Sequence, residues 1–131
     1  MVEPVDQAIY RGLKFDAAHY VPWAKAFDAD GIKWEYRPQV HEEGGYLVDF
    51  LLPDVPMFIV VWSTTFFFEE VAPCVYALVR ESGRPAFITV GPPGEEISML
   101  IERSGRRVKK RWCRWALVVG ELRAAGTLLT D

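Results

Sequence analysis

Residues 56–63 read PMFIVVWS, a run of aliphatic and aromatic side chains whose only hydroxyl is on Ser63. A strand without alternation of polar and apolar residues is typical of the middle of a sheet that is covered on both faces. Shortly before it, residues 46–50 read YLVDF and place one carboxylate, Asp49, inside a second apolar strand. The turn residues PDVP, 53–56, join the two runs, so the sequence predicts a hairpin that carries a single acidic side chain.

A helix is predicted before this hairpin. Apolar side chains follow the i, i+3, i+4, i+7 spacing of one helical face, at Tyr20, Trp23, Ala24 and Phe27. Gly31 stands where a helix commonly ends in a left-handed residue. Pro22 inside a helix would cost about 3 kcal/mol, so the regular helix begins near Val21 or is kinked there.

The remaining chain predicts a mixed sheet and a second helix. Strands are expected over residues 33–40, 45–52, 57–62, 86–90, 97–101 and around 108–119. A helix is expected from about Val71 to Ser82, with Pro73 in its first turn and Gly83 after its end. Residues 121–129 fit either a helix or a strand. The order α-β-β-β-α-β-β-β indicates one α/β or α+β domain over residues 1–131, with a central mixed sheet flanked by helices.

The composition is that of a single globular domain. With 131 residues, 50% of them hydrophobic, the chain can bury one core. No apolar run approaches the ~20 residues that span a bilayer, and the start MVEPVDQAIYRG lacks the basic and apolar regions of a secretory signal. Cys74 and Cys113 form no metal-ligand pattern, so both are expected to be reduced and buried. These features predict a soluble cytoplasmic protein that does not act at a membrane.

Charge is distributed unevenly along the chain. Residues 1–102 carry 7 Lys and Arg against 16 Asp and Glu, a net charge of −9, whereas residues 103–131 carry 8 against 2, a net charge of +6. Seven of those basic residues lie in Arg103–Arg114, RSGRRVKKRWCR. Such a segment suits an acidic protein or a nucleic acid. It equally suits an intramolecular charge match, or a sheet edge whose Lys and Arg discourage strand pairing.

Two stretches, FDAAHYVPWAKAFDADGIKWEYRPQV (15–40) and GYLVDFLLPDVPMFIVVW (45–62), resemble small nucleases of the PD-(D/E)xK superfamily from phages and mobile elements. The matching residues are Trp23, Phe27, Asp28, Gly31, Ile32, Trp34, Glu35 and Tyr36 in the first stretch and Tyr46–Phe50 with Leu52–Asp54 in the second. GRPAFITVGPPG, residues 83–94, is similar to the next strand of that family. The resemblance covers residues 10–94 and implies a restriction-endonuclease-like core, α-β-β-β-α-β, followed by basic C-terminal strands over residues 95–131.

The resemblance implies that most of a nuclease site has been lost. Asp49 occupies the position of a metal-binding Asp. The Glu and Lys of the Glu-x-Lys motif fall on Val60 and Trp62, and the Glu of the first helix falls on Tyr20. Phosphodiester hydrolysis of this kind needs Mg²⁺ held by two or more carboxylates and a Lys that orients the attacking water. Since side chains two apart in a strand share a face, Val60 and Trp62 are expected to point toward the former site and fill it.

A relocated active site stays open as an alternative. Glu69 and Glu70 follow the central strand and could replace the missing carboxylates, with Lys25 on the first helix. Carboxylates at the start of a helix also simply complement its dipole. His19 and His41 have no nucleophile or ligand pattern around them, so both are expected to be structural or surface residues.

Two segments are candidates for binding. Three consecutive aromatic residues at 66–68 cannot all enter one core, so one is expected to contact a base or a protein partner, unless the loop folds over the core or forms a homodimer contact. Residues 111–115, RWCRW, mix Arg with Trp in a way that suits nucleic-acid contacts or cation–π packing. The candidate binding residues are Phe66, Phe67, Phe68, Arg106, Arg107, Lys109, Lys110, Arg111, Trp112 and Arg114.

These patterns favour a catalytically inactive PD-(D/E)xK-like protein that acts by binding, such as a phage or mobile-element accessory or inhibitor protein directed at host defence. No cofactor is expected. A protein partner is favoured over nucleic acid because the chain outside residues 103–114 is acidic. Two alternatives remain: a Mg²⁺-dependent DNA endonuclease that uses Asp49 with Glu69 or Glu70, and a nucleic-acid-binding module that uses residues 103–114.

Overall fold

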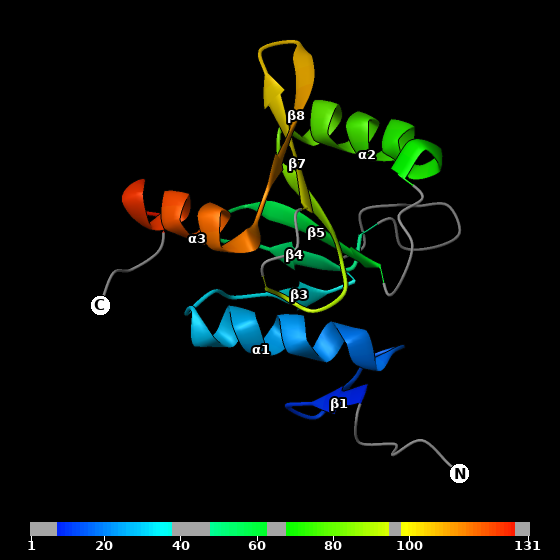
Figure 1. The fold of residues 1–131 in the computed structure, drawn as a ribbon, viewed down its shortest axis with the longest axis vertical. Coiled ribbons are helices and arrows are strands. Elements are labelled where there is room, and N and C mark those ends of the chain that lie inside the picture. Colours follow the sequence, from blue (N-terminus) through cyan, green and yellow to red (C-terminus); the bar gives the residue numbers. More distant parts are fainter. Residues whose placement is uncertain (1–7, 38–47, 63–67, 95–97, 128–131) are drawn as a thin grey trace.

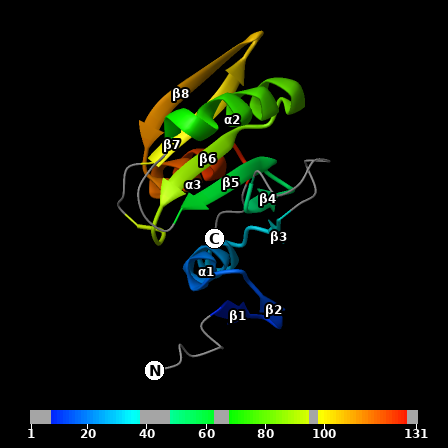
Figure 2. The ribbon, with the colours of Figure 1, turned by 90° about the vertical axis from the view of Figure 1, so that its right-hand side faces the viewer.

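The structure, a computed structural model, describes residues 8–37, 48–62, 68–94 and 98–127. Helices cover both faces of a six-stranded mixed sheet (Figures 1 and 2). Helices α1 (Val21–Ala29) and α3 (Trp115–Ala124) pack on one face, and α2 (Phe68–Ser82) packs on the other. The expected α+β domain with a mixed sheet flanked by helices is confirmed at this level.

The order of the strands in the sheet follows their order in the chain. The strands are β3 (Glu35–Tyr36), β4 (Phe50–Leu52), β5 (Met57–Trp62), β6 (Ala86–Val90), β7 (Ser98–Ser104) and β8 (Arg107–Cys113). Neighbouring strands are antiparallel except β5 and β6, which are parallel because α2 carries the chain back between them. The central strands β5 and β6 therefore have the double-faced apolar pattern that a covered strand requires.

Aromatic rings fill the core beneath α1 and α3. Trp23 and Phe27 of α1 meet Phe50, Phe87 and Trp115 there, and all five are buried. Several rings meet edge to face, with centroids 5.3 Å apart for Phe27 and Phe50 and 5.1 Å apart for Phe87 and Trp115. The core beneath α2 is aliphatic, formed largely by Val60, Val75, Val79, Ile88 and Ile101. Val60 of β5 belongs to this second cluster, so its side chain points away from α1.

The ends of the helices follow local backbone rules. Helix α1 begins at Val21 after a 3₁₀ turn, Ala18–Tyr20, and Pro22 lies in its first turn, where a missing N–H costs nothing. Gly31 (φ 71°) and Gly83 (φ 73°) follow α1 and α2 in the left-handed conformation expected of helix-ending glycines. An unkinked α1 that starts at Val21 is thus the correct one of the two predicted alternatives.

Helix α2 starts earlier than the sequence predicts. It begins at Phe68, so Glu69 and Glu70 lie in its first turn and Pro73 lies inside the helix. The predicted start near Val71 was chosen to keep Pro73 in the first turn. Pro73 instead leaves one carbonyl of the preceding turn without a backbone N–H.

The predicted last strand is wrong beyond Cys113. The chain turns at Arg114 into α3, whose residues Trp115, Val118 and Val119 are buried at helical spacing against the aromatic core. A short run of apolar residues fits the spacing of a strand or of a helix, and here tertiary packing favours the helix. The adjacent strand β7 extends to Ser104, beyond the predicted end at residue 101.

Some predicted elements fall partly outside the described residues. Of the strands expected over 33–40 and 45–52, the structure has β3 and β4, and residues 38–47 lie outside the description. Both cysteines are free thiols, as expected, but Cys74 is exposed on α2 and only Cys113 is buried. Within the described part of the chain, no helix has the length and apolarity to cross a membrane.

A small N-terminal hairpin was not predicted. Strands β1 (Ile9–Tyr10) and β2 (Leu13–Lys14) pair across a turn in which Arg11 and Gly12 both have positive φ, 54° and 79°. The hairpin lies on the side of α1 away from the sheet (Figures 1 and 2). The Tyr10 hydroxyl donates a 2.6 Å hydrogen bond to Asp28 of α1, which also accepts one from the Trp34 indole at 3.0 Å.

Candidate functional site at Asp49 and the β7–β8 hairpin

Asp49 joins three strands at one end of the sheet. Its backbone N–H donates to the Ile59 carbonyl at 2.9 Å, and its carbonyl accepts from the Arg37 N–H at 2.7 Å. Its carboxylate Oδ2 accepts the backbone N–H of Val61 at 2.7 Å. The side chain thus takes the place of a backbone acceptor where the β4–β5 ladder ends, which is a structural use of a carboxylate.

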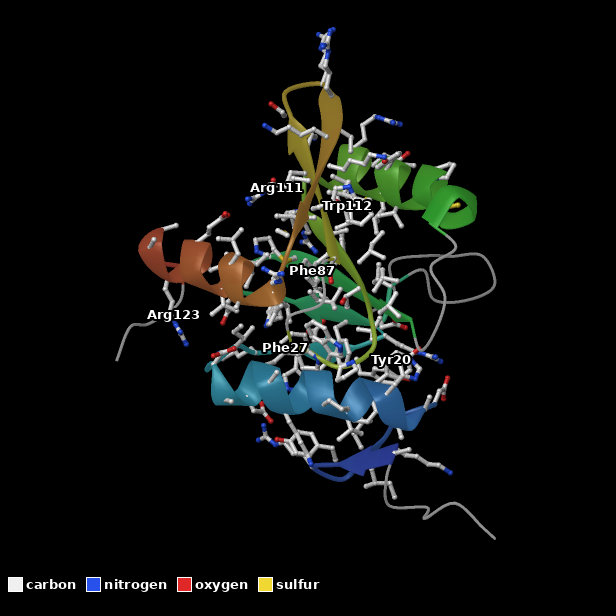
Figure 3. All side chains as sticks on the ribbon, viewed as in Figure 1. Tyr20, Phe27, Phe87, Arg111, Trp112 and Arg123 are labelled. Carbon is white, nitrogen blue, oxygen red and sulfur yellow. The ribbon has the colours of Figure 1, made fainter. Side chains whose placement is uncertain are left out.

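The Asp49 carboxylate is surrounded by hydrogen-bond donors and a positive charge. The Tyr20 hydroxyl hydrogen-bonds to it, and the Arg37 guanidinium and His19 lie close enough to favour its ionised form. Tyr20 is buried, and Figure 3 shows it between α1 and the sheet. The Val61 N–H therefore occupies Oδ2, and the Arg37 charge lies near the carboxylate.

Arg37 is held in place by aromatic rings and by a second acid. Its guanidinium lies 5.2 Å from the Tyr36 ring centroid and 5.9 Å from that of Tyr20, within the range of cation–π attraction. It also forms an ion pair with Asp16. The Tyr36 hydroxyl accepts a 3.1 Å hydrogen bond from the Asp16 backbone. These contacts fix one cation next to Asp49.

Burial dominates the protonation of this cluster. Desolvation raises the pKa of Asp49, although the Val61 N–H, Tyr20 and Arg37 all oppose that rise. Burial, together with the Asp49 charge, raises the pKa of Tyr20 from 10.0 to about 12. The tyrosine therefore stays a protonated donor to the carboxylate at any physiological pH.

This arrangement is poorly suited to hold a divalent metal ion. Mg²⁺ prefers several oxygen ligands, mostly carboxylate and water, in an open octahedral shell. Here Asp49 has a guanidinium beside it and donors on it, both of which compete with a cation. Among the residues that the structure describes, no group of three or more His, Cys, Asp or Glu is placed to hold a metal.

The structure places the sequence-predicted site positions in different ways. Tyr20 and Asp49, far apart in the chain, lie close enough to interact. Val60 does not, because it packs in the aliphatic cluster beneath α2, whereas Tyr20 and Val61 belong to the aromatic cluster on the other face. The expectation that Val60 fills the space beside Asp49 is therefore wrong, and the neighbour of the carboxylate is the backbone of Val61. Trp62 ends β5, and its side chain lies outside the description.

The other candidates are distributed over the molecule. Lys25 is exposed on α1, with its ammonium group 5.8 Å from the Tyr10 ring centroid. The side chains of Phe68, Glu69 and Glu70 are outside the description, although their backbone begins α2. Phe66, Phe67 and His41 lie wholly outside the described residues. The structure therefore gives no relocated carboxylate beside Asp49 in the part of the chain that it describes.

Sequence reasoning missed Arg37, Tyr36 and Asp16. None of the three has a site role in the sequence prediction. Their shared role depends on the packing of the segment before α1 against β3, which no local pattern in the sequence indicates. One weak signal is available, since Arg37 is a long charged side chain next to two rings, Trp34 and Tyr36.

The basic segment forms an extended hairpin of β7 and β8. Figure 1 shows the hairpin extending beyond α2, with its turn at the far end from α1. Arg106, Arg107, Lys109 and Lys110 are all exposed on it. Arg111 differs, because it forms a bidentate pair with Glu121 of α3, at 2.8 and 2.5 Å, and a 3.2 Å contact with Glu102 of β7. Arg111 therefore secures α3 to the sheet, and its charge is used within the fold.

Trp112 lies on the other face of β8. Figure 3 shows its side chain on the side of α2 and Arg111 on the side of α3, as the alternation of a strand requires. Trp112 faces Met99 in the strand register and keeps 60% of its surface exposed. It lines a hollow of about 580 Å³ with Cys113, Arg114, Ala116 and Leu117. Trp112 and Arg114 are thus both exposed, and both line this hollow.

Comparisons of the chain with protein-family models, with curated proteins and with solved structures found no match. The likeness to PD-(D/E)xK nucleases therefore stays an expectation based on residues such as Asp49 and Trp34. A function is therefore inferred from the Asp49 cluster and from the β7–β8 hairpin.

Proposed function

We propose that this protein is a catalytically inactive relative of the PD-(D/E)xK nucleases that acts by binding a protein partner. The observation that carries the proposal is the 2.7 Å hydrogen bond from the Val61 N–H to the Asp49 carboxylate, with Arg37 and Tyr20 beside it. In this role Asp49 is a structural residue that closes one end of the sheet. A metal ion would have to displace these donors and approach a guanidinium.

The resemblance fits this reading in one respect and departs from it in another. Tyr20 and Asp49 correspond by resemblance to two carboxylates of one nuclease site, and these two residues are in contact here. That contact supports a core of common origin in which a tyrosine has replaced the helical Glu. Val60 departs from the pattern because it packs on the opposite face of the sheet. A restriction-endonuclease-like topology is part of the proposal.

The partner is proposed to bind at the β7–β8 hairpin. The segment 103–114, most of which forms the hairpin, contains seven basic residues and no acidic one, and residues 1–102 carry a net charge of −9. An acidic protein surface can match the hairpin without approaching the acidic remainder, whereas a long polyanion would meet both. A role as an accessory or inhibitor protein directed at a host complex is consistent with such a surface.

The test separates binding from catalysis. Purified protein is incubated with plasmid and single-stranded DNA in Mg²⁺ or Mn²⁺, and metal binding is measured by calorimetry. We expect no metal-dependent cleavage and no saturable metal binding, for the wild type and for Asp49→Asn alike. Metal-dependent cleavage that Asp49→Asn abolishes would falsify the proposal. Glu69→Gln and Glu70→Gln are the matched variants, since loss of cleavage in either would identify a relocated ligand.

A further inference from the structure

The base of the β7–β8 hairpin has an exposed apolar hollow. Its largest apolar lining residues, Trp112 and Leu117, are 60% and 52% exposed, and no other large hydrophobic side chain of the described residues is as exposed. The two lie on different elements, since Trp112 is the second-last residue of β8 and Leu117 lies in the first turn of α3. Adjacent exposed hydrophobic residues of this size are unusual on a monomer and mark interaction sites.

The surroundings of the hollow are cationic. Lys110 precedes Trp112 by two residues and therefore shares its face of β8, and Arg114 lines the hollow itself. The segment 103–114 contains seven basic residues and no acidic one. Glu102 and Glu121 are paired with Arg111 on the opposite face of the strand. The exposed basic side chains along β8 favour a negatively charged ligand.

Strand β8 also has an open edge. It is the last strand of the sheet and, within the described residues, pairs only with β7, over all seven of its positions. The outer edge of such a strand presents backbone donors and acceptors to which an extended peptide can add. The Lys and Arg side chains along β8 discourage a second copy of the same basic strand, and they favour an acidic one.

We propose that β8 and the hollow at its end bind an extended acidic segment of a protein partner. Acidic side chains of the segment pair with Lys110 and Arg114, and one aliphatic or aromatic side chain occupies the hollow between Trp112 and Leu117. This proposal rests on the binding function proposed above and specifies the chemistry of its partner.

A peptide fits the hollow better than single-stranded nucleic acid does. Proteins that bind single strands usually provide a series of aromatic platforms along a basic groove. Among the described residues of this hairpin, Trp112 is the only aromatic side chain. Leu117 and Ala116 complete an apolar wall that suits a hydrocarbon side chain. The two classes of ligand also differ in a way that an experiment can resolve.

Binding is tested with labelled peptides and fluorescence anisotropy. The probe is an Asp- and Glu-rich peptide of strand length with one central Leu. Its controls are the same peptide with Ser in place of Leu, a Lys-rich version, and single-stranded DNA of equal charge. We expect the acidic Leu peptide to bind tightest and the Ser version at least tenfold more weakly. Its affinity should fall moderately with salt, since only part of the energy is electrostatic.

Variants locate the site. Trp112→Ala should weaken the acidic peptide at least tenfold, and Trp112→Phe should largely restore it. Lys110→Glu should weaken it several-fold, whereas Lys14→Glu, an exposed lysine on β2, should leave it unchanged. Circular dichroism checks that each variant is folded. The proposal is overturned if Trp112→Ala leaves peptide affinity unchanged, if no peptide binds, or if the DNA binds more tightly through Trp112. Each of these results is independent of the nuclease assay, so the binding partner and the absence of catalysis can fail separately.

Discussion

Asp49 shows how a single carboxylate can persist in an apolar strand without a metal ion. It completes the hydrogen bonding of the Val61 N–H and balances the charge of Arg37. Both contacts join segments that are separate in the sequence, so the side chain stabilises this part of the fold. The sequence indicated that Asp49 lacked partner carboxylates, but it could not reveal the donors, because Arg37 and Tyr20 reach it only through tertiary packing.

Removing the Asp49 carboxylate should destabilise the protein. Asp49→Ala leaves the Val61 N–H and the Tyr20 hydroxyl without this acceptor and removes the negative charge near Arg37, and we expect a loss of about 1–3 kcal/mol in the free energy of unfolding. Asp49→Asn keeps one oxygen acceptor and should lose less. Urea denaturation of the three proteins measures the difference. Equal stability of wild type and Asp49→Ala would show that the carboxylate has no structural role.

The same substitution has a defined pH dependence. Burial raises the folded pKa of Asp49 above 3.8, so the folded state binds this proton more tightly than the unfolded chain does. The resulting stabilisation is present below pH 3.8 and is lost as the pH rises through the folded pKa. The stability of the wild type relative to Asp49→Asn should therefore decrease across that range. Denaturation curves at successive pH values give the difference, and a difference that grows with pH would contradict the assignment.

Tyr20 should control stability at alkaline pH. Its pKa is raised from 10.0 to about 12, so the folded state resists ionisation and loses stability as the pH rises between those values. A rise of this size corresponds to roughly 3 kcal/mol. Tyr20→Phe removes the ionisation, and it should be about 1 kcal/mol less stable than the wild type near neutral pH. By pH 12 the order should reverse. Since Tyr10 and Tyr36 remain in both proteins, the difference isolates Tyr20, and parallel stability curves would rule out its coupling to Asp49.

At the scale of elements, local chemistry defined the interior strands and the ends of helices. Strands β5 and β6 agree with the sequence prediction because each is apolar on both faces and is bounded by Pro or Gly. The end of β8 differs from the prediction, because the apolar pattern of residues 115–119 fits both a strand and a helix. Packing of Trp115 against Trp23 and Phe87 stabilises the helix. The two-residue strands β1 and β2 are too short to produce a pattern.

Helix α2 provides a test at this scale. Pro73 lies inside the helix and is exposed, so Pro73→Ala restores one backbone hydrogen bond without altering the core. We expect a net stabilisation of about 2 kcal/mol, since the gain in the helix exceeds the loss from a more flexible unfolded chain. Thermal and urea denaturation measure it, with Ala77→Gly as a control that should destabilise the same helix. If Pro73→Ala is neutral or destabilising, the helix starts near Val71, as the sequence predicts.

At the scale of the whole molecule, the sequence predicts the separation of acidic and basic residues along the chain. It does not predict where the basic side chains lie in the fold. The sequence indicated a basic segment, 103–114, in an otherwise acidic chain. The structure assigns its members to different places, because Arg111 is paired with α3, Arg114 lines the hollow beside Trp112, and Lys110 is exposed on β8. Which basic residue is paired internally depends on the position of α3, and that element was not predicted.

The strand order of the sheet has a consequence for how the chain folds. Strands β3, β4 and β5 form one antiparallel meander, and β6, β7 and β8 form another. Each meander contains only antiparallel pairings between consecutive strands, and these strands are separated by fewer residues than β5 and β6 are, so their pairing costs less loop-closure entropy. The parallel pair β5–β6 is the single seam between them, and it forms only after α2 has crossed the sheet. Pairing of β5 with β6 should therefore limit the folding rate. Weakening this pairing would separate the two three-stranded meanders and expose apolar strand edges that promote aggregation.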